Sequence, residues 1–238
     1  MQHILICTIF RNREKYIHRW HQQILSFVNH FNDIKFSISI YENDSIDNTK
    51  KTLEMLDLSK FQHNWRRYDN LQTQYYGSIV NKDRVKNLAE ARNLCISQAA
   101  DHMNDYSKIL FIEPDFKYNL EDAIKILNAE KRYGIELDII SGISEMNGVF
   151  YDTWATRRTE SETWGRVEIG DGIDRVWSTF NGFCLYNSKP FQNGIKFDWF
   201  NRRLQTFDCD TAVICENFRE CGYDRIFIEK SAIFKHEV

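Results

Sequence analysis

The chain has 238 residues, a length that suits one α/β domain. Its 31 basic and 34 acidic residues give a net charge of −3, so no basic surplus marks nucleic acid or an anionic membrane as the main partner. Gly (10 residues) and Pro (2 residues) are scarce, which excludes a linker-rich or disordered chain. We expect one ordered domain over residues 1–238.

Strand-like apolar runs and amphipathic helical segments alternate along the chain. In the first half, the pattern predicts strand 4–9, helix 13–31, strand 34–41, helix 50–58, helix 87–100 and strand 106–111. In the second half, it predicts helix 120–132, strand 137–141, one or two strands over 176–186, helix 210–222 and strand 225–229. This alternation favours an α/β fold with a mostly parallel central sheet flanked by helices.

The N-terminal run MQHILICTIF is too short for a membrane span and has no small-residue cleavage site, so we interpret it as a buried strand. No other apolar run approaches the roughly 20 residues that a spanning helix needs. The six cysteines form no CxxC pair, which favours free buried thiols over a disulfide framework or a zinc site. The sequence therefore predicts a soluble, cytoplasmic protein without a signal peptide or transmembrane segment.

An acidic pair, Glu113-Pro114-Asp115, follows the predicted strand 106–111. Proline biases Glu113 towards an extended conformation, so both carboxylates can point at one place. In parallel sheets, ligands bind outside the carboxyl ends of the strands. Mg²⁺ and Mn²⁺ prefer carboxylate oxygens and keep positions for phosphate. We predict a divalent metal on Asp115 and a diphosphate ligand beside it, with Glu113 second to Asp115. A solvated surface turn is the alternative.

A second polar turn, ENDSIDNT over residues 42–49, closes the predicted strand 34–41. Its short acids and amides can accept hydrogen bonds from a nucleobase and from ribose hydroxyls, and they can also cap the following helix. We expect both uses, with Asp44 binding a nucleotide and Asp47 partly structural.

These turns, with four further motifs, carry a resemblance to a known family. In chain order the motifs are SIYENDSIDNT (39–49), LAEARN (88–93), ILFIEPDF (109–116), FYDTWATR (150–157), FNGFCLY (180–186) and CDTAVICE (209–216). The first three resemble the GT-A glycosyltransferases. The whole ordered set, from about Ile4 to Ile228, more closely resembles the capsule-associated α-mannosyltransferases of fungi, the CAP59-like family.

The resemblance implies a Rossmann-like GT-A fold, with a nucleotide-binding half over about 1–115 and an acceptor and catalytic half over about 116–238. It implies metal-dependent transfer of a hexose from a nucleotide diphosphate sugar to a glycan acceptor, with retention at the anomeric carbon, as in polysaccharide biosynthesis. GDP-mannose is the favoured donor and a UDP-sugar the alternative. The implied cofactor is Mn²⁺ or Mg²⁺.

Carried over by position, the resemblance also implies roles for single residues. The implied donor contacts are Glu42, Asp44, Arg92, Glu113, Trp154 and Asn181. The forked guanidinium of Arg92 suits a diphosphate, although an ion pair within its own helix would explain it too. Asp152 and Trp154 would shape the sugar and acceptor side, although a tryptophan is more often a core residue.

Two candidates lie near the C-terminus. Asp210, before the last predicted helix, corresponds to the region that supplies the base or flanks the reacting carbon in GT-A enzymes, although helix capping is an alternative. His236 matches the metal-binding histidine of several such enzymes, although terminal histidines are usually only solvated. At Asn181-Gly182, the glycine permits close backbone approach by a sugar or marks a bulge.

The sequence differs from the fungal family in two respects, and three other functions compete with that of a glycosyltransferase. The fungal proteins are membrane-anchored and place a tryptophan where Phe180 stands, so a shorter, soluble bacterial or viral relative fits better. A sugar-nucleotide nucleotidylyltransferase would need a glycine-rich loop after the first strand, where this chain has FRNRE (10–14). A non-catalytic glycan- or nucleotide-binding module stays possible, although Asp115 and Asp210 argue against it. A glycosidase would not normally place its carboxylates after a nucleotide-type turn.

Overall fold

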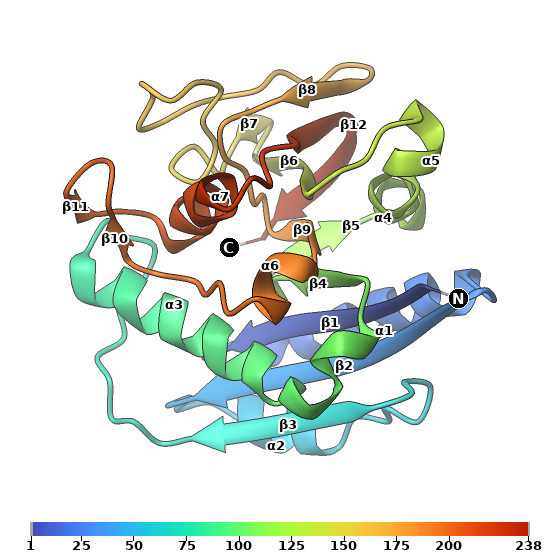
Figure 1. Ribbon diagram of the computed structural model, residues 1–238. Coiled ribbons are helices and arrows are strands. Elements are labelled where there is room, and N and C mark those ends of the chain that lie inside the picture. The colour runs from blue at the N-terminus through green and yellow to red at the C-terminus, as the bar shows by residue number, and fades with distance from the viewer. Residues whose placement is uncertain (1, 238) are drawn as a thin grey trace.

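A computed structural model describes residues 2–237 and shows one twisted sheet with helices on both faces (Figure 1). In spatial order its strands are β3 (Asn64–Asp69), β2 (Ile34–Asn43), β1 (Gln2–Phe10), β4 (Lys108–Ile112), β9 (Phe183–Asn187), β6 (Ile139–Met146), β12 (Ile226–His236) and β5 (Phe116–Tyr118). Two short strands pair at the side of this sheet, β7 (Val149–Phe150) with β6 and β8 (Ile173–Arg175) with β12. Strands β10 (Phe200–Asn201) and β11 (Thr206–Phe207) form a separate hairpin.

Strands β3, β2, β1 and β4 run parallel to one another. β9 is antiparallel to both of its neighbours, β4 and β6, and β6 is parallel to β12. The expected α/β fold with a mostly parallel sheet is therefore confirmed. The strands before residue 115 form one side of the sheet and the later strands form the other.

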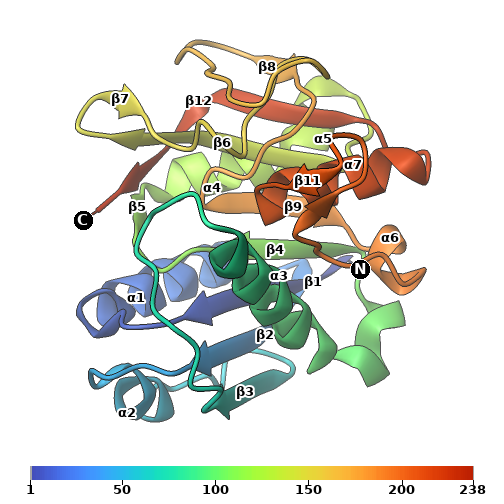
Figure 2. The ribbon, with the colours of Figure 1, turned by 90° about the vertical axis from the view of Figure 1, so that its left-hand side faces the viewer.

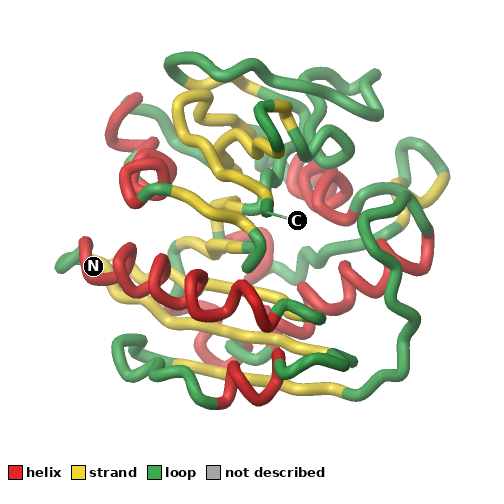
Figure 3. Tube along the Cα trace, turned by 180° about the vertical axis from the view of Figure 1, so that it is seen from behind, coloured by secondary structure: helices red, strands yellow, loops and turns green. Residues whose placement is uncertain are grey.

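Buried apolar residues form one cluster on each face of the sheet. The first face is covered by α1 (Glu14–His30), α2 (Thr49–Glu54), α4 (Leu120–Leu127) and α5 (Ala129–Tyr133), and Figure 3 shows α1 across it from behind. The second face is covered by α3 (Lys82–Ser97), α6 (Lys189–Gln192) and α7 (Asp210–Glu220). A 3₁₀ helix, η1 (Ala100–Asp105), follows α3. Residues 70–81 arch from β3 to the start of α3 (Figure 2).

Several elements differ from the sequence pattern, and three of these differences have a clear physical reason. Only the last part of the predicted strand over 176–186 is a strand, namely β9. Asn181 and Gly182 have φ values of 56° and 70°, and this left-handed backbone interrupts the extended conformation just before β9. The edge strand β3 was missed because its charged residues hide the apolar alternation. The predicted helix 120–132 is two helices, α4 and α5, with Asn128 between them.

Among residues 2–237, no helix combines the length and the apolar character that crossing a membrane requires. All six cysteines are free, and five of them are buried, as the sequence suggested. Cys221 is the exposed one.

We predict that Gly182→Ala lowers the free energy of unfolding by about 3 kcal/mol, because it adds left-handed strain and a Cβ atom that would overlap the ring of Phe116. Gly194→Ala is the matched control, since Gly194 has a φ of 88° but open space around the new Cβ. We expect it to cost only about 1 kcal/mol. Urea unfolding measures both, and equal losses would refute the role of the Phe116 contact.

Candidate active site

A cleft of about 320 Å³ opens at the carboxyl ends of the parallel strands. Most of the candidates singled out in the sequence line it, and they come from distant parts of the chain. These are Arg92, Glu113, Asp115, Asp152, Trp154, Asp210 and His236. Glu42, Asp44 and Asn181 do not line it.

Arg92 on α3 joins two of the carboxylates. Its Nε donates to Oδ2 of Asp210 at 2.8 Å and its Nη1 donates to Oε1 of Glu113 at 2.7 Å. The side chain of Arg92 is buried, with its guanidinium 4.5 Å from the ring centroid of Phe180. The expected alternative, an ion pair within α3, does not occur, because both partners lie on other elements. Arg92 therefore fixes α7 and the end of β4 in one position.

Asp115 and His236 lie side by side. The antiparallel pairing of β5 with β12 sets His236 opposite Phe116, and this brings His236 Nε2 to 3.5 Å from Asp115 Oδ2. Arg13 Nη2, from the loop after β1, lies 3.1 Å from the same oxygen. Burial opposes ionisation of Asp115, but His236 and Arg13 outweigh it and hold the pKa of that carboxyl below its usual value.

The donor set at Asp115 fits a divalent cation held by few protein ligands. In residues 2–237, no group of three or more His, Cys, Asp or Glu side chains is arranged around a metal position. Mg²⁺ and related ions are commonly held by one or two protein groups together with substrate phosphates and water. Asp115 and His236 supply two such groups, and Nδ1 of His236 is buried with no hydrogen-bond partner among residues 2–237. Their role as metal ligands remains a prediction.

Asp152 follows β7 and is positioned by Asn181. The backbone N–H of Asn181 donates to Asp152 Oδ2 at 2.9 Å. Burial, helped by the carboxylates of Asp210 and Glu113, raises the pKa of Asp152 to about 6, against the opposing effects of Asn181 and Arg92. The amide of Asn181 is fully buried and taken up by serine and threonine hydroxyls, so its side chain has no free group to offer a donor.

Asp44 has a structural task in this conformation. Its carboxylate accepts hydrogen bonds from the backbone N–H groups of Leu71, Gln72 and Thr73 and from the hydroxyl of Thr73. Burial raises its pKa, but these bonds outweigh that effect and lower the pKa to about 2. Glu42 is also buried and accepts a hydrogen bond from the backbone N–H of Ser45. Contact of Asp44 and Glu42 with a nucleoside stays a prediction.

A smaller pocket of about 130 Å³ adjoins the cleft. The two share Arg13, Ser78, Arg84, Leu88 and Glu113 in their walls, so they lie directly next to each other. Tyr75, from the segment that Asp44 holds, and Asn43, from the end of β2, line the smaller pocket. Sequence reasoning assigned no site role to Arg13, Arg84 or this tyrosine, since the basic residues at the start of α3 were interpreted as a solvated helix face. The Tyr-Tyr-Gly run at 75–77 was the available signal for the tyrosine.

Three solved structures share the fold over nearly the whole chain. S. aureus TarS, residues 1–349, matches at a TM-score of 0.57 with 14% identity, covering 99% of this chain and 60% of that one. The mannosyltransferase PcManGT from Pyrobaculum calidifontis, solved with GDP-Man and Mn²⁺, matches at 0.57 with 12% identity, covering 99% and 56%. GalNAc-T7, solved with UDP, GalNAc and Mn²⁺, matches at 0.55 with 10% identity, covering 99% and 44%.

The chain therefore has the GT-A glycosyltransferase fold, and it spans about 60% of the length of the first of these structures. Among curated protein sequences, none matches the chain. The family model described as Cryptococcal mannosyltransferase 1 matches residues 3–217. The chain belongs to this family of glycosyltransferases, as its ordered motifs led us to expect.

We predict that Asp44→Asn lowers the free energy of unfolding at pH 7 by about 2 kcal/mol, because the folded state favours the ionised carboxylate. A carboxyl group whose pKa is lowered by folding stabilises the folded state at pH values above its pKa in the unfolded chain, which is near 4. This stabilisation is lost as the pH falls towards 2, the pKa in the folded state. The gap between wild type and Asp44→Asn should therefore narrow between pH 4 and pH 2. Urea unfolding across this range measures it, with Asp101→Asn on the exposed η1 as control. A gap independent of pH would contradict the assignment.

Proposed function

We propose that the cleft binds a nucleotide diphosphate sugar through a divalent cation and transfers its hexose to a glycan hydroxyl. The observation that carries this proposal is the meeting of Asp115 with His236 at the end of β4, in a cleft also lined by Arg13, Arg84 and Arg92. A bound Mn²⁺ or Mg²⁺ would supply a Lewis acid for the departing diphosphate. Arg13 and Arg84 add positive charge suited to phosphate oxygens, whereas the charge of Arg92 is balanced by Glu113 and Asp210.

GDP-mannose is the donor that we propose, with a UDP-sugar as the alternative. The family's description as a mannosyltransferase and the similar fold of PcManGT, solved with GDP-Man and Mn²⁺, support mannose and GDP. TarS, solved with UDP-GlcNAc, supports the alternative. We place the nucleoside in the smaller pocket, against Tyr75 and Asn43, because this pocket shares part of its wall with the cleft.

We propose transfer with retention at the anomeric carbon. The acceptor oxygen forms the new bond to that carbon, the bond from carbon to diphosphate oxygen breaks, and the acceptor proton passes to the diphosphate. Asp210 suits a position beside the reacting carbon rather than the role of base, because Arg92 already holds its carboxylate. If the product proves inverted, Asp152 is the base, since it lines the cleft and its raised pKa favours proton uptake. The anomeric configuration of the product, measured by NMR, decides between the two.

We predict that a nucleoside diphosphate with Mn²⁺ stabilises the protein, because a ligand of the folded state shifts unfolding by mass action. At a concentration of about 100 Kd, GDP or UDP should raise the Tm by roughly 5 °C or more. A thermal-shift panel of GDP, UDP, ADP and CMP, with Mn²⁺ and with EDTA, measures both the base preference and the need for metal. The absence of any metal-dependent shift would count against the proposed function.

We predict that Asp115→Ala removes the Mn²⁺-dependent part of nucleotide binding, because His236 alone remains as a proposed protein ligand. Titration calorimetry with GDP, with and without Mn²⁺, measures this part directly. Asp101→Ala, at an exposed carboxylate on η1, is the matched control. An unchanged GDP affinity of Asp115→Ala in Mn²⁺ would refute the metal site, provided that the variant unfolds cooperatively.

Donor binding and sugar transfer distinguish the proposed function from its main alternative. A non-catalytic binding module would bind the donor but would neither hydrolyse nor transfer its sugar. For a nucleotidylyltransferase the loop after β1 is unsuitable, since residues 10–14 hold no glycine and α1 begins at Glu14. A role in polysaccharide biosynthesis and a cytoplasmic location stay predictions from the sequence.

A further inference from the structure

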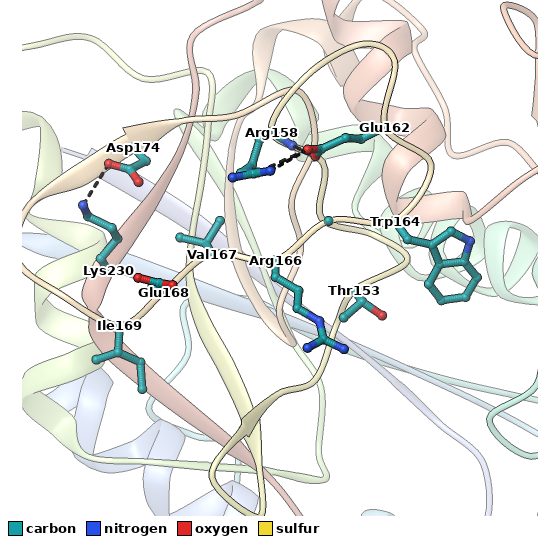
Figure 4. Close-up of a pocket in the computed structure, with 11 residues that line it drawn as sticks. Thr153, Arg158, Glu162, Trp164, Arg166, Val167, Glu168, Ile169, Asp174 and Lys230 are labelled. Carbon is teal, nitrogen blue, oxygen red and sulfur yellow. Dashed lines mark hydrogen bonds and ion pairs between the residues drawn. The ribbon is translucent and has the colours of Figure 1, made fainter.

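Figure 4 shows the residues of a second and larger groove, of about 840 Å³. It is formed by the long irregular segment between Thr153 and Asp174, together with Lys230 on β12. Thr153 and Trp164 line both the groove and the cleft, so the two adjoin at these residues. None of the roles proposed above uses the rest of the groove.

The groove is held in shape by backbone contacts. The N–H of Gly165 donates to the carbonyl of Thr153 at 2.9 Å, and a Cβ atom on Gly165 would come within 2.6 Å of the carbonyl oxygen of Thr156. At the other end, the N–H of Gly170 donates to the carbonyl of Lys230 at 3.2 Å. The segment is thus packed against itself and tied to the sheet, which lowers the entropic cost of binding a ligand.

The charges that line the groove balance. Arg158 pairs with Glu162 at 3.0 Å, and Lys230 pairs with Asp174 at 3.0 Å, as the dashed lines in Figure 4 show. Arg166 and Glu168 also line the groove, and neither has an ion-pair partner among residues 2–237. Three cations therefore face three anions, so the lining has no surplus charge to attract an anionic ligand. The unpaired guanidinium and carboxylate remain free to bond to uncharged hydroxyls.

Two exposed apolar side chains accompany these polar groups. Trp164 is 51% exposed and Ile169 is 60% exposed, and both line the groove. The ring of Trp164 stacks on that of Trp154, with centroids 5.6 Å apart and an interplanar angle of 12°. This stack fixes the plane of Trp164 at the boundary between the groove and the cleft. A flat aromatic surface beside hydrogen-bonding groups suits a sugar ring, which has an apolar face and a polar edge.

We propose that this groove binds the acceptor as a neutral oligosaccharide, whose terminal sugar ring packs on Trp164 and presents its hydroxyl to the cleft. The inference rests on the proposed function, since it names the acceptor class for the same reaction. The groove has more than twice the volume of the cleft and falls in the size range of small-molecule sites, so it has room for more than one sugar ring. Arg166 and Glu168 bond to hydroxyls of the inner rings.

The test is a binding panel on the full chain with GDP and Mn²⁺ present. The probes are neutral trisaccharides of mannose, glucose, galactose and xylose, and trigalacturonic acid as the anionic probe. Saturation-transfer NMR detects binding, and titration calorimetry gives Kd. We expect at least one neutral probe to bind. Trp164→Ala and Arg166→Ala should each raise the Kd of this probe roughly tenfold or more. Binding by trigalacturonic acid alone, or by no probe, overturns the proposal.

Control variants separate a groove effect from general damage. Met55→Ala, at an exposed apolar side chain after α2, is matched to Trp164→Ala. Arg202→Ala, at an exposed arginine outside the groove, is matched to Arg166→Ala. If a variant and its control change the oligosaccharide Kd equally, the proposal is overturned. It is also overturned if Arg166→Ala loses as much affinity for GDP as for the oligosaccharide. Wild-type protein that binds GDP with Mn²⁺ but no trisaccharide refutes the groove alone, whereas failure to bind any nucleotide refutes the proposed function.

Discussion

The ion pairs of one buried arginine hold the cleft together. Arg92 is enclosed by the rings of Phe111, Phe180 and Phe197 and is bonded to Glu113 and Asp210. Burial opposes its charge, but the two carboxylates outweigh this effect and raise the pKa of Arg92 above its usual value. A guanidinium at this position is therefore permanently charged, and it allows two acids to stay buried within the same small volume. Without it, α7 and the end of β4 would repel each other across the cleft.

The same arrangement divides the acids of the cleft into two groups. Glu113 and Asp210 are bound to Arg92, whereas Asp115 faces His236 and Arg13, and Asp152 is held by a backbone N–H. Acids of the first group shape the cleft, and the other two keep groups that a ligand can approach. The first two acids thus have a structural part, and the proposed function assigns the metal and the acceptor side to the other two.

The sequence revealed the acids but not their partners. Glu113 and Asp115 were visible because carboxylates directly after the buried apolar run 109–112 are unusual and need compensation. The bond between Arg92 and Asp210 was not predictable from local patterns, since 118 positions separate the two residues. Arg13 was overlooked because only the pairing of β1 with β4 brings its loop to Asp115. The left-handed backbone of Asn181 and the hydrogen bond from its amide to the hydroxyl of Ser141 were also not visible in the sequence.

Strand β12 carries groups of both the groove and the cleft, Lys230 at the former and His236 at the latter. Its pairing with β6 shifts register between Ile228 and Ile233, so the spacing of these two groups depends on one irregular stretch of backbone. Loss of a single residue there would turn the imidazole to the opposite side of the sheet, because successive side chains of a strand alternate. The length of this irregular stretch thus fixes how far Lys230 and His236 lie from each other. In the reaction proposed above, this distance sets the position along a bound oligosaccharide at which the new linkage forms.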